Sequence, residues 1–151
     1  MLLGMGVDEA EAAMAAWGTP ERLNVPQGAP PQLFARDEGL DLSVMAHFED
    51  GTSVTAIEFM RPDRGEVTVV WDGIDIFGLS DEDVLAELRR RGVTVDDSDL
   101  DYPTCPDVTL GFDRGNDRGH FESVLVAKPG YYTADLPGIY LPITDPNRPL
   151  G

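Results

Sequence analysis

The sequence predicts an α+β domain in which two helix-then-strands repeats place their helices on one face of a mostly antiparallel sheet. Three observations lead to this fold class. Two segments carry helix-start and helix-stop signals, other apolar residues alternate with polar ones as in strands, and the same order of elements occurs twice. The chain has 151 residues, of which 42% are hydrophobic and 26% charged, so we expect one globular domain.

The first helix is expected from Val7 to Trp17. Ala10, Met14 and Trp17 are spaced four and three residues apart, which places them on one stripe of a helix. Gly18 follows and can adopt the left-handed conformation that ends many helices. We therefore expect Met14 and Trp17 to be buried against the sheet.

The second helix is expected between Ser80 and Gly92. Ser80 is a good N-cap residue, and Val84 and Leu88 belong to the apolar stripe that follows it. Three arginines at positions 89–91 occupy the last turn, where cations suit the negative end of the helix dipole. Val84 and Leu88 are therefore expected to face the sheet.

The remaining apolar segments alternate as strands do, and short turn signals such as Asp50-Gly51 separate them. Short turns between consecutive strands favour antiparallel pairing. The expected strands are Ser43–Phe48, Val54–Met60, Val67–Trp71, Ile74–Phe77, a weak strand at Val93–Val95, Val108–Phe112 and Phe121–Ala127. Residues 26–31 are expected to form a loop, and the proline-rich end, about 136–151, is expected to form a tail.

The order helix, strand, turn, strand, basic residue, proline occurs twice along the chain. In the first half His47 to Gly51 is followed by Ala56 to Pro62. In the second half Gly111 to Gly115 is followed by Ser123 to Pro129. Because several matches occur in the same order, we interpret the chain as a tandem duplication within a single domain, 1–151. The boundaries are about 1–73 for repeat one and about 74–130 for repeat two.

The run from Phe77 to Leu85 resembles the helix-opening motif of the beta-lactamase inhibitor protein family and of the related small lipoprotein of the outer-membrane barrel-assembly machine. In this motif Gly78 allows a tight turn, Ser80 caps the helix and Val84 begins the buried stripe. The inhibitors consist of tandem units of this kind, so the resemblance implies the same architecture for residues 1 to about 130. Those inhibitors carry a disulfide in each unit and the lipoprotein a lipidated cysteine near its start, whereas the only cysteine here is Cys105. The resemblance therefore implies an architecture, without lactamase inhibition or barrel assembly.

Acidic residues dominate the charge of the chain. There are 28 Asp and Glu residues against 11 Lys and Arg residues, which gives a formal net charge of -17. Nucleic acids and anionic membranes attract basic proteins, so both are poor partners for this chain, and a basic protein is a better one. Solubility alone also explains such a charge. The sequence does not predict the oligomeric state.

No catalytic or cofactor-binding motif is recognisable in the sequence. The only histidines are His47 and His120, and each lies beside a phenylalanine of an expected strand. We interpret both as partly exposed strand residues rather than as catalytic bases. Cys105 alone can form neither an intramolecular disulfide nor a zinc site built from thiolates.

The acidic segment 96–101 has the alternating aspartates of a calcium loop. The glycine that such a loop needs after Asp101 is replaced by Tyr102, and its glutamate at the twelfth position is replaced by Val108. A solvated acidic loop is therefore expected here. No metal and no cofactor are predicted.

Three classes of function remain open. The first is a non-enzymatic acidic binding protein of inhibitor or immunity type that acts on a basic protein partner. The second is a soluble housekeeping domain whose acidity serves solubility only, and the third is an enzyme that uses carboxylates. For the first class the expected partner-binding residues are His47, Trp71, Tyr131 and Tyr132, because aromatic side chains are common anchors of binding faces.

The start of the chain lacks the features of a signal peptide. Its short apolar segment runs into Asp8 and Glu9, and no basic region precedes it. No stretch approaches 18 apolar residues, the minimum for a membrane-spanning helix. These features predict a cytoplasmic protein.

Overall fold

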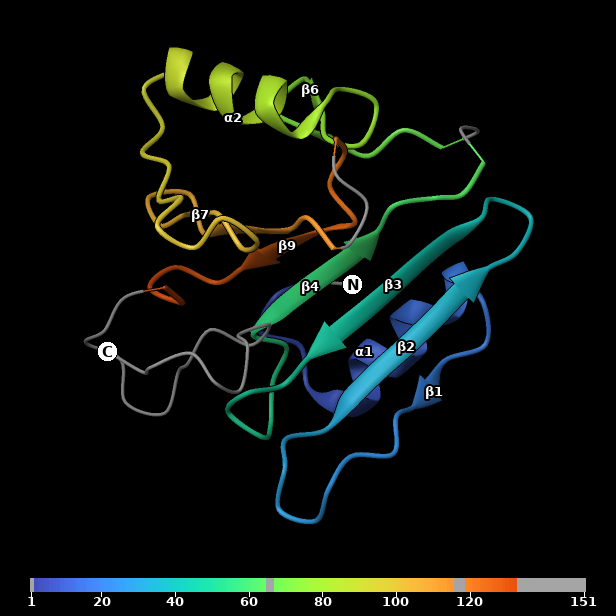
Figure 1. The fold of residues 1–151 in the computed structure, drawn as a ribbon. Helices are drawn as coiled ribbons and strands as arrows, with labels where there is room; N and C mark the ends of the chain where they lie inside the picture. The colour runs from blue at the N-terminus through green and yellow to red at the C-terminus, as the bar shows by residue number, and fades with distance from the viewer. Residues whose placement is uncertain (1, 65–66, 116–118, 133–151) are drawn as a thin grey trace.

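The computed structural model describes residues 2–64, 67–115 and 119–132. Within these residues the chain forms a seven-stranded antiparallel sheet, a two-stranded hairpin and two short α-helices (Figure 1). The fold is α+β, as predicted, and consists mostly of sheet. The helices are α1 (Val7–Met14), continued by the 3-10 helix η1 (Ala15–Trp17), and α2 (Asp81–Arg90). The strands are β1 (Glu21–Arg22), β2 (Gln32–Asp37), β3 (Leu42–His47), β4 (Ala56–Met60), β5 (Val70–Trp71), β6 (Ile74–Asp75), β7 (Thr104–Cys105), β8 (Leu110–Asp113) and β9 (Ser123–Ala127).

The large sheet has the strand order β1-β2-β3-β4-β9-β8-β7, and every neighbouring pair is antiparallel. Strand β4 lies between β3 and β9 (Figure 1). The pairing of β4 with β9 places Ala56 opposite Ala127 and Glu58 opposite Leu125. This pair joins the early and late parts of the chain in the middle of one sheet.

Helix α1 passes behind β2 and β3 in Figure 1. Its Ala10 and Met14 are fully buried in a cluster that also contains apolar side chains of β2, β3 and β4. Trp17 is half-buried and meets Phe59 edge to face, with ring centroids 6.5 Å apart. The predicted stripe is therefore confirmed for Met14, whereas Trp17 lies at the margin of the cluster.

Gly18 ends the first helical segment for a steric reason. Its φ is 128°, a value that favours glycine, and a Cβ at this position would overlap the carbonyl of Arg36 in β2. The chain can leave the helix only by passing close to the backbone of β2.

Helix α2 begins as the sequence predicts. The amide of Asp83 donates a hydrogen bond of 3.1 Å to Oγ of Ser80, the N-cap residue. Val84 and Leu88 are fully buried, and they share a cluster with Phe112 of β8 and with other apolar residues. The predicted burial of both side chains is confirmed.

Four predicted strands correspond to β3, β4, β8 and β9, with small shifts at their ends. The prediction of a strand at Val93–Val95 is wrong, because the amide of Val93 instead donates to the carbonyl of Leu88 and closes the end of α2. The strand predicted at Val67–Trp71 is reduced to β5, and that at Ile74–Phe77 to β6. Strands β1, β2 and β7 were not predicted. Residues 26–31 form a loop, and the predicted tail lies outside the described residues.

Candidate protein-binding face

Successive side chains of a strand point to opposite faces of its sheet. In β2 and β3 the side chains of Leu33 and Val44 enter the same buried cluster as α1. The residues that follow them, Phe34 and Met45, therefore lie on the other side of the sheet. In β4 the same alternation separates Ile57, which belongs to the α1 cluster, from Glu58. We call the side that carries Phe34, Met45 and Glu58 the outer face.

One row of residues crosses the whole outer face. Residues that lie opposite each other in antiparallel strands point to the same side, so the pairings of successive strands define this row. From β1 to β7 it consists of Glu21, Phe34, Met45, Glu58, Leu125, Gly111 and Thr104. Glu58 occupies its centre.

A buried polar network crosses the middle of the outer face. Nε2 of His47 lies 3.0 Å from Oε1 of Glu58, and Oγ of Ser123 donates to Oε2 of Glu58 at 2.7 Å. The amide nitrogen of Gln32 lies 3.4 Å from Nδ1 of His47. His47 is 3% exposed, Ser123 4% and Glu58 7%. The prediction that His47 is partly exposed is therefore wrong, because its polar partners come from neighbouring strands and cover it.

The order of groups in this network does not fit nucleophilic catalysis. A serine nucleophile needs a base that contacts its hydroxyl, and His47 has no such contact with Ser123 because the carboxylate of Glu58 lies between them. All three side chains are also buried. The network therefore fixes β3, β4 and β9 relative to one another.

Two tyrosines cover one half of the outer face. A turn after β9, closed by a hydrogen bond of 3.1 Å from the amide of Tyr131 to the carbonyl of Lys128, folds the chain back. Tyr131 is 1% exposed and meets Tyr132 edge to face, with ring centroids 5.1 Å apart. Beneath the tyrosines lie Ala56, Leu125 and Ala127, which form a cluster with them. We call this region the covered half.

Gly111 gives the covered half its shape. A Cβ at this position would overlap the hydroxyl oxygen of Tyr132, so any larger residue here would displace the tyrosine ring from its present position. Burial raises the pKa of Tyr132, and the nearby carboxylate of Glu58 raises it further. Burial, with the carboxylate of Glu49, also raises the pKa of Tyr131. Both predicted anchors thus lie on the outer face as part of its packing, and their contact with a partner stays a prediction.

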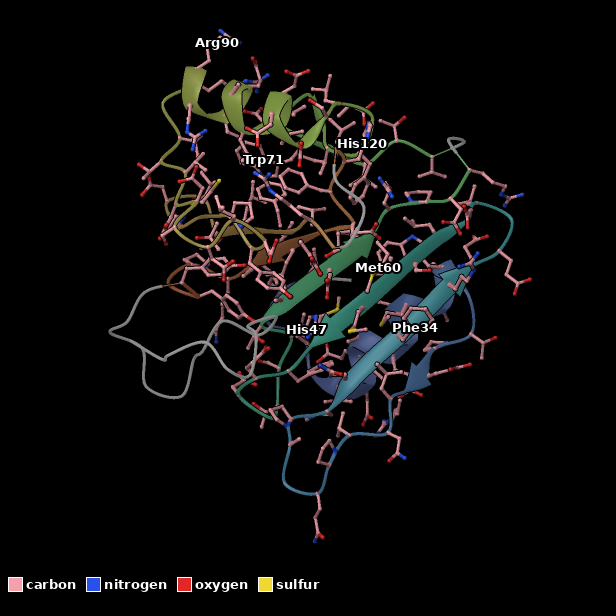
Figure 2. All side chains as sticks on the ribbon, in the orientation of Figure 1. Phe34, His47, Met60, Trp71, Arg90 and His120 are labelled. Carbon is pink, nitrogen blue, oxygen red and sulfur yellow. The ribbon has the colours of Figure 1, made fainter. Side chains whose placement is uncertain are left out.

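The other half of the outer face carries large apolar side chains that are only half-buried. They are Phe34 in β2, Met45 opposite it in β3, and Met60 at the end of β4. Figure 2 marks Phe34, His47 and Met60 along these three strands. We call Phe34, Met45 and Met60 the open patch. Sequence reasoning missed it, although Phe34 and Met45 alternate with buried residues of their strands.

Trp71 is not brought together with the other predicted anchors. It lies in β5, outside the seven-stranded sheet, and packs half-buried against the cluster that contains α2 (Figure 2). Nη1 of Arg91 reaches the carboxylate of the adjacent Asp72 at 3.3 Å. The structure therefore brings together His47, Tyr131 and Tyr132 but places Trp71 elsewhere.

Several carboxylates lie near the β8 end of the outer face, and one of them, Glu122, is paired with Arg61. Asp113 lies opposite Ser123 and is half-buried. Burial raises the pKa of Asp113; a hydrogen bond from the amide of Gly115 opposes this rise, and the carboxylates of Glu58, Glu122 and Asp101 reinforce it. A positively charged group placed near Asp113 would lower the free energy of its ionised form.

The other groups considered as candidates, the acidic segment 96–101 and Cys105, lie in surroundings that favour a structural role. In the part of the chain that the structure describes, no three His, Cys, Asp or Glu side chains are arranged to hold a metal ion. The start of the acidic segment 96–101 is held in place by two backbone hydrogen bonds between Asp96 and Thr104. Cys105 is buried, and burial raises the pKa of its thiol to about 12. Across residues 2–64, 67–115 and 119–132, none of the helices has both the length and the apolar character needed to cross a membrane.

Comparisons with known proteins do not assign this chain to a family. No protein-family model matches it, and no curated protein or solved structure is significantly similar to it. The geometry of the outer face is therefore the basis of the functional proposal.

Proposed function

We propose that this protein is a non-enzymatic binding protein of inhibitor or immunity type, and that it presents the outer face of its sheet to a basic protein partner. The open patch is the observation that carries the proposal. Its three large apolar side chains are only partly buried, and they lie beside a polar network whose groups are already paired. Large apolar side chains that remain partly accessible beside polar groups are a feature of many protein-binding surfaces.

We further propose that the face is built from two helix-then-strands units, about 1–73 and 74–130, whose helices cover the opposite side of the sheet. The aligned segments support this, because Glu58 and Leu125 hold equivalent positions in them and lie opposite each other in the sheet. Phe59 of β4 packs against both helix-containing clusters, which supports a common side for the two helices.

The pairing of the strands corrects one part of the repeat alignment. His47 lies opposite Ala56, and Asp113 lies opposite Ser123, the residue aligned with Ala56. Asp113, rather than Gly111, therefore occupies the place equivalent to His47.

The charge supports a basic partner. The formal net charge of -17 attracts a basic protein over a distance, and the exposed Glu21 and the half-buried Asp113 lie on the outer face itself. Electrostatic attraction of this kind accelerates association and weakens as salt screens it. Binding is therefore expected to be salt-sensitive.

The test is a pull-down from cells of the source with the immobilised protein at low and high salt. Phe34→Ala removes the aromatic ring of the open patch, and Leu100→Ala serves as the control because Leu100 is exposed in the acidic segment instead. We expect a basic protein to be retained at low salt, released at high salt and lost from Phe34→Ala alone. Trp71→Ala tests the predicted anchor outside the sheet. A partner held equally by the protein and Phe34→Ala, or at both salt levels, would contradict the proposal.

A further inference from the structure

We infer that the partner seats an aromatic side chain, flanked by a basic residue, on the open patch. This inference rests on the proposed function and adds the chemistry of the contact. The covered half of the same sheet face already holds two aromatic rings. There Tyr131 and Tyr132 lie over Leu125, which belongs to the same cross-strand row as Phe34 and Met45.

The side chains of the open patch suit an aromatic ligand better than an aliphatic one. Phe34 lies directly opposite Met45, so a phenyl ring and a thioether stand side by side, and Met60 adds a second thioether on the next strand. Aromatic rings attract both other rings and methionine sulfur beyond the gain from area alone. Methionine is also flexible enough to adapt to a ring placed on it.

The charges beside the patch favour a basic neighbour for that ring. Glu21 lies opposite Phe34 on the edge strand β1 and is exposed. Arg36 is also on the outer face, further along β2 than the residues that pair with β1, and its Nη2 lies 2.7 Å from the carboxylate of Asp41, which also pairs with Arg64. A lysine or arginine on the β1 side of the partner's aromatic residue would therefore meet the carboxylate of Glu21.

The experiment is a titration of the full chain, labelled with carbon-13 at its methionine methyl groups, with a synthetic peptide of one tryptophan between paired lysines. The methyl groups of Met45 and Met60 report on the patch. Those of Met5 and Met14 are internal controls, because both residues belong to the cluster that contains α1. Matched peptides replace the tryptophan by leucine or the lysines by glutamates.

We expect saturable shifts at Met45 and Met60 but not at Met14. The leucine peptide should bind about 2- to 12-fold more weakly than the tryptophan peptide, as expected from the extra attraction between rings. Glu21→Gln should weaken the binding of the peptide that contains lysines. The glutamate peptide should produce no saturable shift. Phe34→Leu should remove most of the preference for tryptophan while the methyl signal of Met14 stays in place, which shows that the variant remains folded.

Several outcomes would overturn the inference. Equal affinity for the tryptophan and leucine peptides would do so while leaving the proposed function intact, provided that the pull-down still depends on Phe34. Shifts of Met45 and Met60 with protein concentration alone would show that a second copy occupies the patch. The same shifts on removal of residues 133–151 would show that the chain's own end occupies it. Loss of both the peptide response and the Phe34-dependent pull-down would refute the inference and the proposed function together.

Discussion

The two halves of the outer face differ in the size of the residues that form their floor. In the covered half the tyrosines of the chain pack on Ala56, Leu125, Ala127 and Gly111. The open patch consists of larger side chains that remain half-buried. Small residues leave room above the sheet for a ring from the same chain. In the open patch the side chains of Phe34, Met45 and Met60 fill the corresponding space themselves. The difference is the basis for the proposal that the open patch, rather than the covered half, contacts a partner.

The largest expected effect is a difference in stability between the two halves. Tyr131→Ala removes a fully buried ring and should lower the free energy of unfolding by about 3–5 kcal/mol. Phe34→Ala removes a half-buried ring and should cost roughly 1 kcal/mol. Urea unfolding of both variants measures the difference. Equal losses would mean that the open patch is as much a part of the core as the tyrosines.

The buried network between the two halves gives the next prediction. His47→Leu leaves the buried carboxyl group of Glu58 without one of its two hydrogen-bond partners and should cost about 1–3 kcal/mol. The double variant His47→Leu, Glu58→Leu removes the carboxyl group as well and should recover much of that loss, because replacing both partners of a buried hydrogen bond by apolar groups can be nearly neutral. Thermal or urea unfolding tests the recovery. A double variant less stable than His47→Leu would contradict a purely structural network.

The glycine in the covered half provides a more local test. Gly111→Ala places a methyl group where the hydroxyl of Tyr132 lies and should destabilise the fold by about 1–3 kcal/mol. Tyr132→Phe removes that hydroxyl and should relieve part of the loss in the double variant. Chemical denaturation of the two single variants and the double variant measures this coupling. Strictly additive losses would show that residue 111 and the ring do not meet.

The smallest effect concerns Asp113, which faces other carboxylates at the end of the covered half. Because its pKa is raised in the folded protein, mainly by burial, its contribution to stability falls as the pH rises through the unfolded value of about 4. Asp113→Asn cannot ionise and can still accept the hydrogen bond from Gly115. The variant should therefore be more stable than the wild type at neutral pH, and the difference should shrink in acid. A variant that is less stable than the wild type at neutral pH would contradict a raised pKa of Asp113.

The sequence predicted the elements whose signals are local. Ser80 and the stripe through Val84 and Leu88 identified α2, and alternation identified β3, β4, β8 and β9. The two-residue strands β1 and β7 are too short to show a pattern, so they could not be found. Their existence depends on the backbone of the neighbouring strands.

The candidate site could be predicted only in part, because it depends on contacts between distant segments. His47 is buried by Glu58 and by its neighbours, and Glu58 is held in turn by Ser123 of a strand far along the chain. Tyr131 is buried because the turn after β9 folds back, which no local pattern indicates. The open patch had a usable signal, since Phe34 and Met45 alternate with buried residues in their strands. That signal becomes informative only when the strands are known to pair.

The most direct test of the division between folding and binding is the affinity of the captured partner for three proteins. These are the wild type, Phe34→Ala and Tyr131→Phe, which changes the covered half without removing its ring. We predict that Phe34→Ala weakens binding at least tenfold, equivalent to about 1.4 kcal/mol, while Tyr131→Phe leaves the affinity unchanged. Unchanged affinity for Phe34→Ala, or an equal loss in both variants, would contradict the assignment of the open patch as the binding half.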